Sequence, residues 1–244
     1  FGAIDIATVL AKSSNVGMAH IALALAPQQA WTALTRLGFG GVPSSGDPGE
    51  SAGLLPGSPQ WRPIGSGTMS HGYGLSVTPL QLAHAYATIG SLGVARPVSF
   101  LAADGPVAGT PVFEEPTCHE LLRMLESGVA AEGTGKLAAI PGYRVSGKTG
   151  TAWKATAGGY STDRYMAVFG GVAPATAPRL AAVVVIDEPS AGQHMGGQVS
   201  APVFSRVVGG ALRLLAVAPD APVRAPEELP ANAAPDALRT AALR

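Results

Sequence analysis

Two short polar motifs, far apart in the chain, contain side chains that can take part in acyl transfer. The first is Ser13-Ser14-Asn15, and the second is Lys148-Thr149-Gly150-Thr151. Acyl transfer through a serine requires a nucleophile, a base, a proton donor for the leaving amine and an oxyanion hole. Hydroxyl, amide and ammonium groups can fill several of these roles. The same residues also have simpler explanations, because Ser and Asn cap helices and a lysine can be an exposed strand residue.

The segment around Lys148 also matches a phosphate-binding loop, which makes nucleotide binding an alternative. Residues 142–149 fit the pattern Gly-x4-Gly-Lys-Thr, and Asp187-Glu188 follows an apolar run, as the acid that holds Mg²⁺ does in such enzymes. A phosphate loop must open a helix, whose N-terminal amides hold the phosphates. The residues after Lys148 are poor helix formers, and residues 143–146 alternate like a strand. The sequence therefore favours a strand here and leaves nucleotide binding as a remote alternative.

No other set of residues indicates a metal or cofactor site. Five histidines lie without metal-ligand spacing, at His20, His71, His84, His119 and His194. Asp187-Glu188 is better explained as a solvated turn at the end of a strand. We therefore expect neither a metal nor a cofactor.

The hydrophobic pattern predicts mainly helices in the first half of the chain. Apolar residues recur at helical spacing over residues 4–26, and the polar Lys12–Asn15 segment is expected to end one helix and cap the next. Further helices are predicted over about 28–37, from Thr78-Pro79 to 90, from Thr117 to 128, and over 202–217. Residues 39–72, rich in Gly, Pro and Ser, are predicted to form a long irregular segment.

Lys148 lies in the first of three predicted strands. These strands cover residues 143–153, 165–172 and 180–186, and turn-rich stretches between them indicate an antiparallel meander. Helices first, then adjacent strands, then a helix indicate the α+β class rather than alternating α/β.

The composition excludes several functional classes. Sixteen basic and sixteen acidic residues give zero net charge, which argues against nucleic-acid binding because that needs a basic surface. The longest apolar run, residues 180–186, is far shorter than the ~20 residues of a membrane-spanning helix. The single cysteine, Cys118, cannot form an internal disulfide. Apolar residues make up 47% of the chain, enough for a buried core.

Taken together, the two polar motifs resemble those of the penicillin-recognising acyl transferases, in which Ser-x-Asn precedes Lys-Thr-Gly. Further segments are similar to class B penicillin-binding proteins, and most of all to the septal cell-division transpeptidases. These segments are residues 72–75, 77–83, 86–90, 142–145, 171–174, 183–186 and 199–204. The resemblance covers roughly residues 4–217. It implies a mainly antiparallel sheet packed with helices, together with a helical lobe.

The resemblance implies a D,D-transpeptidase with catalytic roles for Ser13, Asn15 and Lys148. Such an enzyme cuts the terminal D-Ala–D-Ala bond of a peptidoglycan stem peptide and links the peptide to a neighbouring amine. Ser13 would relay a proton to the departing amine, and Asn15 would offer its amide to the substrate backbone. Lys148 would supply positive charge to the terminal carboxylate of the substrate.

The same resemblance implies substrate-binding roles for Thr149, Gly150 and Thr151. The two threonines would hydrogen-bond the substrate carboxylate, and the backbone N–H of Thr151 would form half of the oxyanion hole. Gly150 would let the acyl chain approach the strand edge and pair with it. A serine acyl-enzyme needs no cofactor.

Relatives take the nucleophile and its base from a Ser-x-x-Lys turn, which is expected before the Ser-x-Asn motif. The chain has four lysines, and the residues three positions before them are Val9, Gly133, Val145 and Thr151. We therefore expect that the chain lacks the nucleophile, is an N-terminally incomplete part of a transpeptidase domain, and is inactive alone. Residues 1–217 are expected to belong to that domain, and residues 218–244, rich in Ala and Pro, to be a disordered tail.

The family resemblance further implies the ligands, partners and location of such a protein. The ligands are peptidoglycan stem peptides and β-lactam antibiotics. The partners are cell-division proteins, including a membrane glycosyltransferase, and the location is the bacterial inner membrane with the domain facing the periplasm.

Two alternatives stay within the same superfamily. A serine β-lactamase-like hydrolase would need a deacylating Glu with an Asn four residues later, and no Glu between Asn15 and Lys148 has that partner. A penicillin-binding module without catalysis stays open, because the motif that decides it lies outside this sequence.

Overall fold

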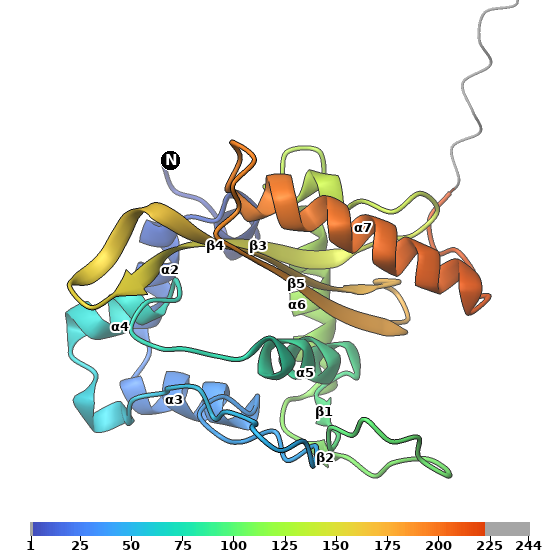
Figure 1. Cartoon of the computed structure of the whole chain (residues 1–244), viewed down its shortest axis with the longest axis horizontal. Helices are drawn as coiled ribbons and strands as arrows, with labels where there is room; N and C mark the ends of the chain where they lie inside the picture. Colours follow the sequence, from blue (N-terminus) through green and yellow to red (C-terminus); the bar gives the residue numbers. More distant parts are fainter. Residues whose placement is uncertain (1, 223–244) are drawn as a thin grey trace, which may run out of the picture.

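The computed structural model describes residues 2–222, in which a three-stranded sheet lies between helices (Figure 1). Strands β3 (Ser146–Thr156), β4 (Gly159–Ala173) and β5 (Leu180–Asp187) are antiparallel and lie in the order β3-β4-β5. Helix α7 (Gly196–Leu214) covers one face of the sheet, and α5 (Pro79–Gly90) and α6 (Glu115–Ser127) lie on the other side. This arrangement confirms the α+β class and the predicted meander.

The main hydrophobic core lies between the sheet and α7. Phe169 of β4 and Phe204 of α7 are fully buried, with ring centroids 4.8 Å apart. Leu212 and Val208 of α7 extend the same cluster along the helix. Because burying a large apolar side chain contributes about 1.5–3 kcal/mol, this layer fixes α7 against the strands that carry the second polar motif.

The N-terminal helices surround the first polar motif. Helix α1 (Ile6–Lys12) ends at Ser13, and α2 (Asn15–Ala24) begins after Ser14, whose Oγ accepts a hydrogen bond of 3.1 Å from the Gly17 N–H. This confirms the prediction that the polar segment ends one helix and caps the next. Helix α3 (Pro27–Arg36) follows and matches its predicted range.

The segment predicted to be irregular, residues 39–72, contains more structure than its composition indicates. It includes the 3₁₀ turn η1 (Ser58–Gln60) and helix α4 (Pro63–Met69), which packs against α2. Helix α4 starts with a proline at its first turn, where the missing N–H costs nothing. The expectation of a wholly irregular segment was therefore wrong, because this tertiary contact outweighs the low helix propensity of Gly and Ser.

Two helices begin earlier than their sequence pattern predicted. Helix α6 starts at Glu115, with Pro116 in its first turn, so Thr117 lies inside the helix instead of capping it. Helix α7 starts at Gly196 and contains Pro202. Its first residues are held by contacts with the sheet, such as the 3.0 Å hydrogen bond from Ser200 Oγ to the Ala167 carbonyl. Such contacts between elements are not visible in the residues of α7 alone.

Two short strands were also missing from the predicted elements. These are β1 (Val94–Ala95) and β2 (Thr110–Pro111), which pair with each other after α5. With two residues each, they carry no pattern that can be recognised in a sequence.

The strand around Lys148 decides between the two interpretations of its motif. Lys148 lies inside β3, opposite Gly170 of β4 in the antiparallel register. Residue 156 ends the strand and a hairpin follows, so Lys148 is followed directly by strand and not by a helix. The phosphate-loop alternative is therefore wrong, since its amides would have to come from a helix N-terminus at this point.

The chain after α7 returns to the start of β3. The Asp220 carboxylate accepts hydrogen bonds from the Arg144 N–H at 2.7 Å and from the N–H and hydroxyl of Thr176 at 3.1 and 2.8 Å. The Ala221 N–H also donates to the Gly142 carbonyl at 3.1 Å, so contacts with the domain extend past residue 217. The proposed domain boundary at residue 217 stays a prediction, because residues 223–244, most of the predicted tail, lie outside the described residues.

Candidate active site

The fold brings the two polar motifs together. Lys148 Nζ donates a hydrogen bond of 2.8 Å to Ser13 Oγ, across 135 positions of sequence. The same ammonium lies 3.0 Å from the Thr149 carbonyl oxygen and 3.4 Å from Thr149 Oγ1. Lysine and serine therefore form one hydrogen-bonded group where the two motifs meet.

The position of Ser13 depends on an unusual backbone conformation. Ser13 ends α1 with φ 53° and ψ 49°, in the left-handed region, and its N–H bonds to the Leu10 carbonyl. This conformation reverses the chain between α1 and α2, and it directs the Ser13 hydroxyl to β3. A non-glycine residue in the left-handed region costs about 1–2 kcal/mol, so the surrounding packing must hold it there.

Thr149 is oriented by a neighbouring loop that the sequence did not reveal. Thr134 Oγ1 lies 2.7 Å from Thr149 Oγ1, which fixes one hydroxyl against the other. The same loop is tied to α1, because Lys12 Nζ donates to the Glu132 carbonyl at 3.1 Å. One loop thus links the Ser13 turn to strand β3.

Thr151 and Gly150 are held from the other side by the start of α7. The Gly196 N–H donates a hydrogen bond of 2.9 Å to Thr151 Oγ1. A Cβ on Gly196 would lie 2.3 Å from the Gly150 carbonyl oxygen, so only glycine allows this approach. Strand β3 is an edge strand of the described sheet, and such an edge presents unpaired backbone groups that can bind an extended peptide.

Burial lowers the pKa of Lys148 from 10.5 to about 8. The cause is desolvation, since an ammonium group is stabilised by water and loses it in this site. Directly paired residues of antiparallel strands project to the same face of a sheet. On the face that Lys148 occupies, the ring of Tyr86 packs against Gly170, the partner of Lys148 in β4, at a point where a Cβ would lie 2.3 Å from the ring. Lys148 is thus only partly hydrated and open to an anionic partner.

A cleft of about 810 Å³ surrounds these residues. It is lined by Ser13, Asn15, Lys148, Thr149, Gly150 and Thr151, all six of the predicted site residues, and among others by Thr134, Ser70, His71 and Tyr73. Asn15 is exposed at the first turn of α2 and forms no side-chain hydrogen bond within residues 2–222, so its amide is free for a ligand.

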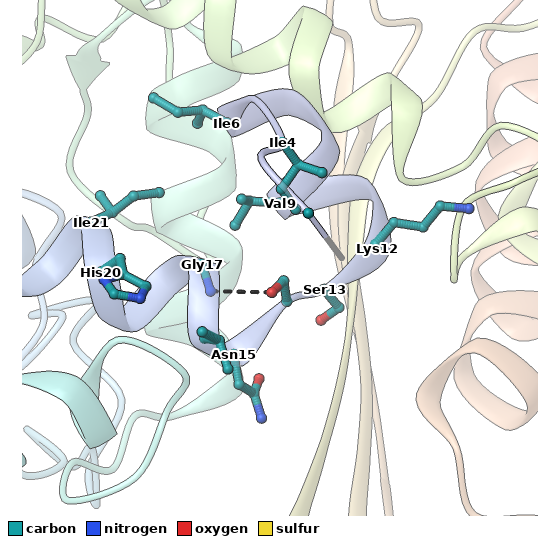
Figure 2. Close-up of a pocket in the computed structure, with 12 residues that line it drawn as sticks. Ile4, Ile6, Val9, Lys12, Ser13, Asn15, Gly17, His20 and Ile21 are labelled. Atoms are coloured by element: carbon teal, nitrogen blue, oxygen red, sulfur yellow. Dashed lines mark hydrogen bonds between the residues drawn. The ribbon is translucent and has the colours of Figure 1, made fainter.

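A second hollow of about 710 Å³ lies against the same turn. Figure 2 shows it with Ile4, Ile6, Val9 and Ile21 among its lining residues and with the bond from the Gly17 N–H to the Ser14 hydroxyl. Ser13 and Asn15 line both hollows, whereas Lys148, Thr149 and Thr151 line only the neighbouring cleft.

The residues suspected of metal binding have other partners. Lys154 Nζ lies 2.8 Å from Asp187 and 2.7 Å from Glu188, so both carboxylates are occupied by an ion pair. Within the described chain, no three His, Cys, Asp or Glu side chains gather closely enough to hold a metal ion.

Sequence reasoning missed several cleft residues, of which Thr134 and Tyr73 contact β3. Thr134 lies between two glycines in Gly133-Thr134-Gly135, a turn pattern that was available but was not linked to β3. Tyr73 belongs to a segment used for the family resemblance, and its hydroxyl accepts a 3.3 Å hydrogen bond from the Trp153 N–H. Both contacts join distant segments, which a sequence motif does not show.

Comparisons with known proteins identify the family and the fold. The family model described as penicillin binding protein transpeptidase domain matches residues 2–209. The chain is 46% identical over 221 residues to the peptidoglycan D,D-transpeptidase FtsI of Escherichia coli, covering 91% of this chain and 38% of that protein. It is 39% identical over 225 residues to the probable peptidoglycan D,D-transpeptidase PenA of Neisseria meningitidis, covering 92% of this chain and 39% of PenA.

A solved structure has the same fold. The apo TP domain of Burkholderia pseudomallei penicillin-binding protein 3 superposes with a TM-score of 0.86 and 46% identity, covering 91% of this chain and 68% of that one. The chain spans about two fifths of the length of the curated relatives. None of the helices in residues 2–222 has both the length and the hydropathy that crossing a bilayer requires. By sequence and by fold, this chain belongs to the penicillin-binding protein transpeptidase domain family.

Proposed function

We propose that this chain provides the substrate-carboxylate and proton-transfer side of a peptidoglycan D,D-transpeptidase site. The observation that carries the proposal is the 2.8 Å contact between Lys148 Nζ and Ser13 Oγ inside the cleft. A hydroxyl and an amine in hydrogen-bond contact can exchange a proton with a reacting group near neutral pH. The pKa of Lys148, lowered to about 8, supports that role.

In this proposal Lys148, Thr149 and Thr151 bind the terminal carboxylate of a D-Ala–D-Ala stem peptide or the acid group of a penicillin. An ammonium and two hydroxyls are the donors that such a carboxylate needs. Thr134 and Gly196 support the assignment, because they fix the Thr149 and Thr151 hydroxyls. The free edge of β3 would hold the acyl chain as an added strand, with the Thr151 N–H as one oxyanion donor.

Ser13 would relay a proton to the amine that leaves when the D-Ala–D-Ala bond breaks. Its hydroxyl gives a proton to the leaving nitrogen and takes one from the base of the Ser-x-x-Lys turn, which this sequence does not contain. Asn15 would hold the substrate backbone with its free side-chain amide. The attacking serine would come from the same Ser-x-x-Lys turn.

The wider setting is part of the proposal. Relatives that carry the name peptidoglycan D,D-transpeptidase support cross-linking of stem peptides during septal wall synthesis, with β-lactams as inhibitors. A Burkholderia ambifaria neighbour described as a peptidoglycan glycosyltransferase, with 42% identity and a TM-score of 0.83, is in keeping with a partnership between this domain and glycan synthesis. We place the domain on the periplasmic side of the inner membrane, with cell-division proteins as partners.

Covalent labelling with benzylpenicillin tests the proposal. This chain alone is expected to gain no penicilloyl mass, because no Ser-x-x-Lys is present. A longer polypeptide that joins this sequence to a Ser-x-x-Lys segment is expected to gain one adduct, at that serine. The control is the same polypeptide with that serine changed to alanine. An adduct on this chain alone, or none on the longer polypeptide, would contradict the proposed division of roles.

A further inference from the structure

A third hollow, of about 400 Å³, lies apart from the active-site cleft and shares no lining residue with it. It is formed by one face of α5, the segment 94–99 and the start of β5. Its polar lining consists of His84, Thr88, Ser91, Arg96, Ser99 and Arg179. We propose that this hollow binds a short acidic peptide segment of a partner protein, with a carboxylate on the two arginines and an apolar side chain beside them.

The charge of the hollow points to an anionic ligand. Arg96 and Arg179 are exposed, and neither forms an ion pair within residues 2–222. None of the described residues that line the hollow is Asp or Glu. Guanidinium groups bind carboxylates through two parallel hydrogen bonds, so two unpaired arginines at one hollow favour a carboxylate-bearing partner.

The walls of the hollow are fixed before any ligand binds. His84 Nε2 contacts the Arg96 carbonyl oxygen at 2.8 Å, and because a carbonyl can only accept, the ring nitrogen carries the proton. This bond ties α5 to the segment that bears Arg96. The Gly93 N–H bonds to the Thr88 carbonyl at 2.9 Å and holds the turn between them. A hollow that is already formed binds with less ordering cost than a mobile one.

The hydroxyl of Thr88, which lines the hollow, has no hydrogen-bond partner within the described residues. The residue is 1% exposed. A buried hydroxyl without a partner is costly and rare in folded proteins. A polar group of a bound ligand, or a small shift of α5 upon binding, would satisfy it.

A smaller cavity of about 90 Å³ adjoins the hollow and indicates what accompanies the carboxylate. The two share five lining residues, Ala87, Ser91, Arg179, Leu180 and Ala181, and the smaller cavity is also lined by Gly90, Val172 and Pro178. Its size suits one aliphatic side chain. An acidic residue next to a leucine or valine would therefore place its carboxylate at the arginines and its neighbour in the small cavity, which favours a peptide over a free acid.

Fluorescence anisotropy on this chain tests the proposal with a labelled peptide of alternating Leu and Glu. We expect saturable binding, at least tenfold weaker binding for the matched Leu–Gln peptide, and no competition by free glutamate at equal concentration. The variant R96Q/R179Q should weaken binding at least tenfold, because it removes both charged donors. The control R206Q/R213Q loses the same charge from exposed positions of α7, outside the hollow, and should bind like the parent.

A steric variant tests the site independently of charge. Ala87→Leu places a good helix former on the exposed face of α5, so thermal melting should stay unchanged while the peptide is excluded from the junction of the two cavities. Thr88→Val should keep the fold and weaken binding several-fold. Equal binding by R96Q/R179Q and R206Q/R213Q, equal binding of the Gln peptide, competition by free glutamate, or no binding at all would each overturn the proposal. Because the hollow is separate from the cleft, none of these outcomes bears on the proposed transpeptidase site.

Discussion

Lys148 Nζ lies 2.8 Å from Ser13 Oγ, although 135 positions separate the two residues in the chain. Ser13 reaches this position because α1 ends in the left-handed conformation, and Lys148 reaches it from the edge strand β3. A loop at Glu132 and Thr134 connects both sides, through Lys12 and through Thr149. The contact therefore depends on three segments: the turn at Ser13, strand β3 and the loop that carries Thr134. A substitution in each segment tests its contribution separately.

Replacing Ser13 by glycine should remove the hydroxyl without disturbing the turn. Glycine adopts a φ of 53° freely, whereas alanine at this position keeps the strain. We expect Ser13→Gly to melt at or above the temperature of Ser13→Ala, and both variants to acylate slowly with penicillin in a polypeptide that also carries Ser-x-x-Lys. Acylation at the parent rate by Ser13→Gly would contradict a role for the hydroxyl.

Thr134→Val should weaken the binding of carboxylate-bearing β-lactams by roughly two- to tenfold, which corresponds to one hydrogen bond. The reason is that Thr149 Oγ1 loses the partner that orients it, at 2.7 Å. Thr134→Ser keeps a hydroxyl and is the matched control. Titration with a penicillin and with its methyl ester separates a lost carboxylate contact from a general structural effect, because the ester lacks the charge that Thr149 is proposed to bind. An equal loss for both ligands would indicate a structural effect only.

Lys148→Met should stabilise the protein at pH 7. Burial lowers the pKa of Lys148 to about 8, so at pH 7 the folded protein holds a charged lysine at a desolvation cost that the unfolded chain does not have. Between pH 8 and 10.5 the unfolded lysine still binds a proton and the folded one does not, so the stability of the parent rises with pH across this window. The variant lacks this rise.

Urea denaturation of parent and variant at pH 7 and pH 10 measures the effect. The free energy of unfolding of Lys148→Met should exceed that of the parent, and this excess should be larger at pH 7 and should shrink as the pH rises. A difference that is the same at both values would show that Lys148 is not desolvated in the folded state.

Gly170→Ala should destabilise the protein by about 1–3 kcal/mol, the usual cost of overpacking a well-filled site. The added Cβ would lie 2.3 Å from the ring of Tyr86, opposite Lys148 in the sheet. Gly210→Ala in α7 is the control, because no atom beyond its chain neighbours and its own helix backbone lies within 4 Å of the new Cβ and alanine favours the helix. The melting temperature should fall for Gly170→Ala and should stay the same or rise for Gly210→Ala.

Much of the fold was predictable because its strongest signals are local. The polar segment at Ser13-Ser14 predicted a helix boundary, and alternating apolar residues predicted the strands. The start of α7 and helix α4 were not predictable, because their glycines and prolines are poor helix formers that only contacts with other elements stabilise. Such contacts have no counterpart in the neighbouring sequence.

The candidate site, like the fold, could be predicted from the sequence only in part. The motif residues Ser13, Asn15 and Lys148 could be identified from their types and order, and the structure places them in one cleft. Thr134 could not, since its importance lies in a distance of 2.7 Å to a residue of another segment. The lowered pKa of Lys148 likewise arises from burial, which depends on the whole fold.

The most direct test of the central claim is the second-order rate constant of penicillin acylation for Lys148→Ala, in a polypeptide that joins this sequence to a Ser-x-x-Lys segment. Loss of the charged contact to the ligand carboxylate should lower that constant by roughly ten- to a hundredfold, as expected for a charged hydrogen bond. The control is Lys154→Ala, because Lys154 lies in the same strand as Lys148 but pairs with Asp187 and Glu188. This variant should acylate at the parent rate. An unchanged rate for Lys148→Ala would contradict the assignment of Lys148 to the substrate carboxylate.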